Sequence, residues 1–315
     1  MKPQIISLLL ILLFGTNLFG QQDPLHVNTS NIRFIRLNYE NDFFTQTDEY
    51  YTQGIKLESE APVFRYSPIM WLLPNLRNST IQYGLNAVQD CFTPTSITSP
   101  TILYGDRPFA GYIYLGHYKI SSDLYKKQKL TSEIDLGEIG SCAECKQEQE
   151  AIHKATNNAQ PYGWQYQIGT GLFFDYKLRY EKAIYVDTAI DIDAVGQFNA
   201  GTVYDNALLG ITLHLGKMHP YFSGNRSSAF QLYGIVQAWA EGVGYNGTLQ
   251  GALFTKNSPY TLQSNEMNRV VFGDSYGLCL SKGKMSVVYS VTLITNEIIT
   301  GTYHGWGHID ITYFF

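Results

Sequence analysis

The last residues of the chain alternate between apolar and polar side chains and end on an aromatic residue. The apolar members, which would share one face of an extended strand, are Ile309, Ile311, Tyr313 and Phe315. The polar members, on the opposite face, are His308, Asp310 and Thr312. A soluble sheet can show the same alternation, but a terminal aromatic behind an export signal indicates a transmembrane antiparallel β-barrel. We therefore expect an all-β protein in the bacterial outer membrane.

The first twenty residues have the composition of a secretory signal peptide. Lys2 supplies a positive charge, and the apolar run 5–14 is too short to cross a bilayer as a helix. Gly20 is a suitable cleavage point, although Leu18 is not ideal three residues before the cut. The sequence predicts a signal peptide over 1–20 and one outer-membrane β-barrel domain over 21–315.

The composition agrees with a barrel. Charged residues make up 16% of the chain and aromatic residues 14%, with 24 tyrosines, whereas soluble domains carry about 25% charged residues. No long apolar stretch follows the signal, which argues against a helical membrane protein. The net charge of −5 argues against a nucleic-acid partner.

Alternation with a period of two, bounded by turn residues, predicts about twelve strands. They span 31–40, 50–60, 79–88, 109–120, 129–138, 165–176, 179–190, 202–213, 229–240, 268–280, 284–295 and 302–315. Each has about the ten residues that a tilted strand needs to cross a membrane. A barrel of this size is usually filled or plugged, so a passive pore is not favoured. We expect a monomer.

An even number of strands places both chain ends in the periplasm and assigns a side to every connection. The outward connections are 41–49, 89–108, 139–164, 191–201, 241–267 and 296–301. The periplasmic ones are 61–78, 121–128, 177–178, 214–228 and 281–283. Among these, 61–78 and 214–228 are long for periplasmic turns.

Acidic side chains crowd the first outward loop, beside Asn41. They are Glu40, Asp42, Asp48 and Glu49. Hard oxygen ligands at this density suit Ca²⁺, although a solvated acidic loop has the same composition. Asp42 and Thr52 both fall in the polar phase of their strands, which would bring them together across one hairpin. Farther along, Asp106 and Arg107 form a pair that is usually a structural salt bridge at a barrel rim.

The outward loop 139–164 contains a stretch of helix-forming composition, 145–155. Gln149 and His153 are four residues apart and would share one helix face. A histidine can serve as a general base near neutral pH, whereas a lone histidine on a surface helix is usually inert. The first and third outward loops lie on the same side of the membrane, which favours a shared site.

Four cysteines are present. Cys142 and Cys145 have the spacing of a zinc half-site or a redox pair, but no second pair with zinc spacing follows. In an exported chain a disulfide is favoured. The candidates are a local Cys142–Cys145 bridge or a link to Cys91, whereas Cys279 has the setting of an ordinary apolar strand residue.

A series of short motifs covers residues 35–176 in order. They are Glu40-Asn41-Asp42, Asp48-x-Tyr50-Tyr51-Thr52-x-Gly54, Asp106-Arg107-Pro108-Phe109-Ala110-Gly111, Gly137-x-Ile139-Gly140, Gln149-x-x-x-His153 and Pro161-x-Gly163-Trp164. Each motif alone is weak, but their order and spacing together are specific. The series resembles the outer-membrane lipid A 3'-O-deacylase family.

The resemblance implies a twelve-stranded barrel that uses Ca²⁺ to remove the 3'-linked acyloxyacyl group from lipid A in the outer leaflet. By the same resemblance, His153 is the general base that activates water and Asp42 is the main side-chain calcium ligand. Asn41 and Thr52 correspond to polar groups of the same active site, and Gln149 to a neighbour on the histidine's helix. No acyl-enzyme intermediate is implied.

The chain departs from the family pattern in two places. The loop 89–108 lacks the lysine that some members carry, so Arg107 is its only cation, and the segment 156–160 after His153 contains no acidic residue. Two other hypotheses follow. One is a non-catalytic barrel that binds lipopolysaccharide or stabilises the outer membrane. The other is an outer-membrane phospholipase, but no His-x-Ser pair occurs at His214, His219, His304 or His308.

Overall fold

The computed structural model describes residues 28–45, 49–223, 226–254 and 257–315. The predicted signal peptide over 1–20, its cleavage point at Gly20, and Asp48 of the acidic loop lie outside the described residues.

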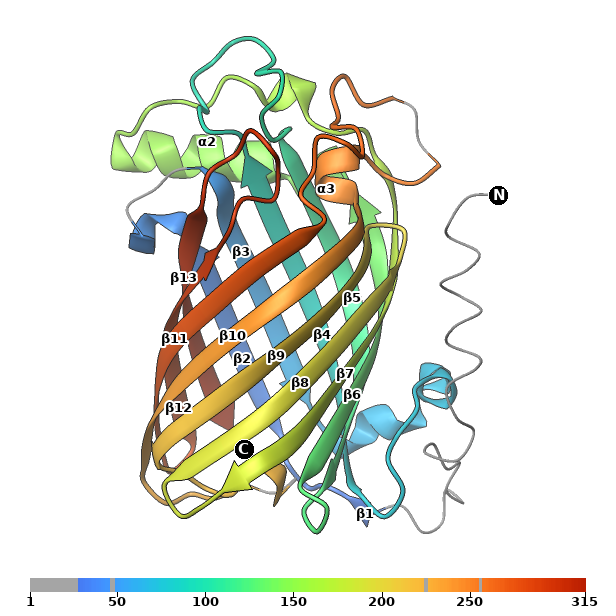
Figure 1. The fold of residues 1–315 in the computed structure, drawn as a ribbon, viewed down its shortest axis with the longest axis vertical. Coiled ribbons are helices and arrows are strands. Elements are labelled where there is room, and N and C mark those ends of the chain that lie inside the picture. Colours follow the sequence, from blue (N-terminus) through green and yellow to red (C-terminus); the bar gives the residue numbers. More distant parts are fainter. Residues whose placement is uncertain (1–27, 46–48, 224–225, 255–256) are drawn as a thin grey trace.

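Twelve strands form a closed antiparallel barrel (Figure 1), as the sequence predicts. They are β2 (Phe34–Asn41), β3 (Tyr50–Glu60), β4 (Thr80–Thr93), β5 (Ala110–Asp123), β6 (Gln128–Ile139), β7 (Gly171–Val186), β8 (Ile190–Gly201), β9 (Tyr204–Lys217), β10 (Gln231–Asn246), β11 (Val270–Lys282), β12 (Met285–Ile294) and β13 (His304–Phe314). Each strand pairs with the next, and β13 pairs with β2 to close the barrel. The short β1 (Asn28–Thr29), which the sequence did not predict, pairs in parallel with β4.

The two ends of the barrel differ. Phe34 and Phe314 are in register, so the first and last barrel strands meet at one end, which we call the turn end. The opposite loop end carries α2 (Cys145–Thr156) and α3 (Gly247–Gln250), as Figure 1 shows. Short 3₁₀ helices complete the connections: η2 (Asp42–Thr45), η3 (Pro62–Tyr66), η4 (Pro68–Leu72), η5 (Ser141–Ala143), η6 (Trp164–Tyr166) and η7 (Tyr221–Ser223). None of the helices in the described ranges is both long and apolar enough to span a membrane.

The structure corrects the predicted boundaries of two neighbouring strands. The sequence predicts strands over 165–176 and 179–190, a turn at 177–178 and a loop at 191–201. The chain instead runs straight through 177–178 in β7, and most of the predicted loop is strand β8. The predicted turn is wrong because Lys177 is a lumen residue, whose Nζ lies 2.6 Å from the Asp135 carboxylate.

The actual turn between β7 and β8 has a weak sequence signal. It covers 187–189, where the Asp187 carboxylate accepts a hydrogen bond from the backbone N–H of Thr188. Just before it, the pairing of β7 with β8 shifts between Ala183 and Tyr185. The shift interrupts the alternation, and Ile184 and Tyr185 are both exposed. The two-residue alternation therefore does not locate the turn of this hairpin.

Alternation elsewhere separates a polar lumen from an apolar outer wall. On β5, Tyr114 and Tyr118 are buried in the lumen, while Leu115 between them is 67% exposed on the wall. Ion pairs between neighbouring strands line the lumen, such as Arg36 on β2 with Glu58 on β3, 3.3 Å apart. An apolar outer band with a polar interior is the pattern of outer-membrane barrels.

Candidate active site

Helix α2 carries two of the predicted site residues on one face. Gln149 and His153, four residues apart, are both buried, while Lys146 and Glu150 on the exposed face form an i,i+4 ion pair. The helix ends at Asn157, which adopts a left-handed conformation with φ of 57° and donates its N–H to the His153 carbonyl. The helix predicted over 145–155 is therefore present, and its buried face turns toward the barrel.

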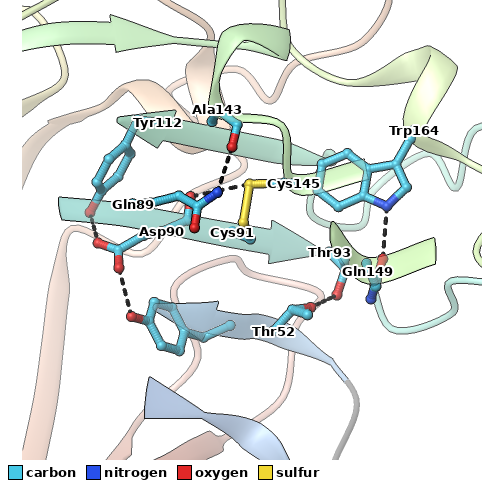
Figure 2. Close-up of a disulfide and its surroundings, with 11 residues drawn as sticks. Thr52, Gln89, Asp90, Cys91, Thr93, Tyr112, Ala143, Cys145, Gln149 and Trp164 are labelled. Carbon is cyan, nitrogen blue, oxygen red and sulfur yellow. Dashed lines mark hydrogen bonds between the residues drawn. A yellow bond between two sulfur atoms is a disulfide. The ribbon is translucent and has the colours of Figure 1, made fainter. Parts of the chain in front are cut away.

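A disulfide fixes the start of α2 to the barrel wall. It joins Cys145, the first residue of the helix, to Cys91 on β4, as Figure 2 shows. Of the two bridges considered from the sequence, the link to Cys91 is correct and the local Cys142–Cys145 bridge is wrong. Cys142 instead lies beside Glu138, and burial together with that carboxylate raises the pKa of its thiol to about 11.

The disulfide has room because its neighbour on β5 is a glycine. A Cβ at Gly111 would lie 2.4 Å from the Cys145 Sγ atom, so any side chain there would displace the bridge. A hydrogen bond adds a second attachment: the Gln89 Nε2 atom donates to the Ala143 carbonyl at 2.6 Å. Helix α2 is thus held against the outside of β4 and β5.

One cross-strand row on the outer wall runs beneath α2. Asn41 on β2 is in register with Gln53 on β3, Gln53 with Cys91 on β4, and Cys91 with Gly111 on β5. Residues directly opposite each other in a sheet point to the same face. Because Cys91 reaches α2 on the outside, Asn41 and Gln53 also face outward.

A β-bulge at Thr52 lies on β3 between a lumen-facing residue and an outward-facing residue. The register shifts between Tyr51 and Gln53, which leaves Thr52 as the extra residue. Tyr51 points into the lumen, where its hydroxyl lies 2.9 Å from the Asp90 carboxylate, whereas Gln53 faces the outer wall. The Thr52 and Thr93 hydroxyls are 2.7 Å apart, which ties the bulge to the end of β4 (Figure 2).

The end of β2 is shaped by an Asx turn. The Asn41 Oδ1 atom accepts a hydrogen bond from the Phe43 backbone N–H at 2.8 Å, and its Nδ2 atom donates to the Tyr39 hydroxyl at 3.1 Å. This turn begins η2 and sets the position of Asp42, which is 3% exposed.

The buried face of α2 and the top of the first hairpin enclose one pocket of about 420 Å³. All five residues predicted for the site line it, namely Asn41, Asp42, Thr52, Gln149 and His153. Its other lining residues, which the sequence did not single out, are Tyr39, Phe43, Phe44, Gln53, Ile152, Thr156 and Asn158. Residues more than one hundred positions apart in the sequence therefore form a single concave site.

The hydrogen bonds of His153 define its tautomer. Its Nδ1 atom lies 2.6 Å from the Ala159 carbonyl oxygen, which can only accept, so Nδ1 carries the proton. In the neutral ring the Nε2 atom is then an unprotonated acceptor. The segment 156–160 has no acidic side chain that could orient the histidine ring. The backbone carbonyl of Ala159 serves as the acceptor instead.

Two buried amide groups add hydrogen-bond donors. The Gln149 Oε1 atom accepts from the Trp164 indole N–H at 2.7 Å, which fixes the amide. Its Nε2 atom is buried and has no partner among the described residues. The Gln53 Nε2 atom is likewise buried and unpaired within the described residues. A buried unpaired donor costs about 1–3 kcal/mol, so two at one pocket suit a ligand with acceptor oxygens. The sequence analysis missed Gln53 because its place opposite Asn41 depends on the strand register, which only the structure shows.

The comparisons with known proteins identify the family. A family model described as outer membrane protein LpxR matches residues 6–315. The chain belongs to this family. The resemblance and the outer-membrane location predicted from the sequence are therefore confirmed.

One solved structure agrees with this assignment at the level of the fold. LpxR from Salmonella typhimurium has a TM-score of 0.74 at 20% identity, over 90% of this chain and 100% of that chain. The β domain of the Bordetella autotransporter BrkA has a TM-score of 0.45 at 8% identity, over 90% and 97% of the two chains. No curated protein matches the chain significantly in sequence.

The single cation of the loop 89–108 does not belong to the pocket of this LpxR-family protein. Arg107 is 3% exposed and pairs with Glu297 and the Thr248 hydroxyl at the mouth of the barrel. The sequence predicted a structural salt bridge between Arg107 and Asp106. Arg107 instead pairs with Glu297, and the Asp106 carboxylate accepts hydrogen bonds from the Thr95 N–H and hydroxyl. Among the described residues that line the pocket, none is lysine or arginine.

The pocket opens on the outer wall of the barrel, away from the lumen. Two apolar lining residues are exposed beside it, Phe43 at 77% and Ile152 at 40%. The polar groups of the pocket and these exposed apolar side chains thus meet at the loop end, on the outer wall of the barrel.

Proposed function

We propose that this chain is a calcium-dependent hydrolase that removes the 3'-linked acyloxyacyl chain of lipid A in the outer leaflet of the outer membrane. The observation that carries the proposal is the convergence of the His153 imidazole, the Asp42 carboxylate and two buried amides on one lipid-facing pocket. Membership in the LpxR family supports the choice of substrate.

His153 acts as the general base. Its Nε2 atom removes a proton from a water molecule, and the resulting hydroxide attacks the carbonyl carbon of the ester. The Ala159 carbonyl accepts the Nδ1 proton, which orients the ring and stabilises the imidazolium that forms. The same imidazolium then returns the proton to the departing sugar oxygen. The products are the free fatty acid and a hydroxyl group on the sugar.

Gln149 and Gln53 stabilise the negative charge on the ester oxygen. Their Nε2 groups are buried and have no protein acceptor in the described chain, so they can donate to the oxyanion in the transition state. Such donors typically contribute 10²–10³ in rate each. They supply positive dipoles at a site whose described lining holds no lysine or arginine.

The donor atoms around Asp42 fit Ca²⁺. The pocket offers a buried carboxylate at Asp42, a hydroxyl at Thr52 and an amide oxygen at Asn41, all hard oxygens of the kind that Ca²⁺ prefers. The described residues contain no group of three or more His, Cys, Asp and Glu side chains placed for a metal, so backbone carbonyls would complete the set. Bound calcium would polarise the ester carbonyl.

The test is a mass spectrum of lipid A from cells that express the wild-type chain or His153→Ala, with Ca²⁺ present. We expect loss of an acyloxyacyl mass with the wild type and a decrease in rate of 10²–10⁴ with the variant. Lys154→Ala, which changes the next, exposed residue of α2, is the matched control and should retain activity. Unmodified lipid A with all three folded barrels would support a barrel that only binds lipopolysaccharide, and full activity of His153→Ala would refute the mechanism.

A further inference from the structure

The long connection between β3 and β4, residues 61–79, lies on the outside of the barrel at the turn end. Figure 1 shows its two 3₁₀ helices, η3 and η4, beside the strands at the end opposite α2. Met70 and Leu73 are buried against Ile81 and Tyr83 of β4 and Ile134 of β6. These barrel residues belong to the outer face, because Glu133 and Asp135 on either side of Ile134 point into the lumen.

Polar side chains of the outer wall hold the backbone of this connection. The Lys119 Nζ atom donates to the carbonyls of Met70 and Leu73 at 2.9 and 2.6 Å, and Lys119 is buried. The Tyr176 hydroxyl donates to the Leu72 carbonyl, and Ser132 to that of Pro74. A charged lysine exposed to lipid on the outer wall would destabilise the barrel. The connection covers Lys119 and supplies acceptors for its ammonium group.

The opposite face of the connection is apolar and uncovered. The exposed fractions are 62% for Val63, 72% for Tyr66, 77% for Trp71 and 66% for Leu72. The same strands carry exposed apolar residues farther from the turn end, such as Leu85 at 38% and Leu136 at 47%. The apolar face therefore continues the lipid-facing band of the wall.

The charges of the connection are of one sign. Arg65 and Arg77 are both exposed, and residues 61–79 contain no acidic side chain, in a chain whose net charge is −5. The Arg65 guanidinium lies over the Tyr66 ring, 4.6 Å from its centroid. Aromatic residues beside arginines are characteristic of the level of lipid headgroups.

We propose that residues 61–79 form a lipid-binding anchor in the periplasmic leaflet of the outer membrane. Trp71 and Leu72 enter the acyl boundary, and Arg65 and Arg77 bind the phosphates of anionic glycerophospholipids. The proposal does not depend on the hydrolase activity, since this surface lies at the other end of the barrel from the pocket.

The test uses the full chain in phosphatidylcholine vesicles that contain a minor amount of brominated phosphatidylglycerol or brominated phosphatidylcholine. Trp71 is one of four tryptophans, so its quenching is the difference between the wild type and Trp71→Phe. We expect stronger quenching by the anionic lipid and little by aqueous acrylamide. The double variant R65Q/R77Q should reduce the preference for the anionic lipid on the order of tenfold.

The matched control is K126Q/K127Q, which removes two cations from the β5–β6 turn at the same end of the barrel and should preserve the preference. Equal quenching by the two lipids, or an equal loss in the control, would overturn the assignment to Arg65 and Arg77. Quenching of Trp71 by acrylamide alone would place the face in water. Protection from both quenchers in a dimeric particle would assign it to a second copy of the chain.

Discussion

Removal of the Cys91–Cys145 disulfide should loosen α2 selectively. The bridge joins residues 54 apart in sequence, but the strand ladders already hold Cys91 on β4 and Ile139 at the end of β6. With the barrel folded it closes only the short free chain from 139 to 145, for which the chain-entropy relation gives about 2 kcal/mol at 25 °C. The ladders that join β4, β5 and β6 remain after its removal. The lost free energy therefore weakens mainly the attachment of α2 to the wall, where about 2 kcal/mol corresponds to roughly 30-fold in the equilibrium of local detachment.

Other contacts still hold the helix in the variant. The bonds from Gln89 to Ala143 and from Trp164 to Gln149 contribute about 1 kcal/mol each, and Trp164 packs on Phe109 with ring centroids 4.8 Å apart. We expect C91A/C145A to fold as a barrel and to retain part of its activity. His153 lies eight residues after Cys145, about 12 Å along the helix, so detachment at the start displaces the base.

The assay is native-state hydrogen exchange of the amides in α2 and in β5, with lipid A hydrolysis measured on the same preparations. Exchange in α2 should accelerate by roughly 10–10²-fold while β5 is unchanged. Cys142→Ala, which removes a cysteine outside the bridge, should resemble the wild type. Unchanged exchange in α2, or equal acceleration in β5, would refute the local argument.

Three further predictions concern the pocket and its surroundings. Gln53→Met keeps the size of the side chain but removes the donor, so hydrolysis should fall on the order of 10²-fold with little change in Ca²⁺ dependence; a normal rate would exclude Gln53 from the oxyanion site. EGTA should abolish hydrolysis and added Ca²⁺ restore it, and Asp42→Asn should raise the Ca²⁺ concentration for half-maximal rate on the order of tenfold; activity that persists in EGTA would contradict calcium dependence. Because the pKa of Cys142 is raised to about 11, its thiol is protonated at neutral pH, and alkylation by iodoacetamide should accelerate about tenfold per pH unit until pH 11; a plateau near pH 9, absent in Cys142→Ser, would show an unperturbed thiol.

The barrel could be predicted from the sequence because alternation is repeated in nearly every strand, and the last strand alone shows it clearly. The prediction of strand boundaries failed where a local feature interrupts the two-residue alternation. The register shift between Ala183 and Tyr185 and the lumen position of Lys177 both depend on a neighbouring strand. Such partners have no signature within a single segment.

The candidate site was predictable in its motifs but not in its geometry. Asn41, Asp42, Thr52, Gln149 and His153 stand out as residue types at regular spacings, and the structure gathers them at one pocket. The choice of Cys91 as disulfide partner requires the cross-strand row beneath α2, which only the register reveals.

The position of the pocket on the outer wall has a kinetic consequence. A substrate that is itself a membrane lipid would reach His153 by lateral diffusion, without crossing the lumen. The rate of the proposed reaction would then follow the mole fraction of lipid A within the leaflet and not its bulk concentration. Addition of inert detergent or lipid at constant total substrate would slow turnover by surface dilution, and tight packing of the leaflet would limit access in intact cells.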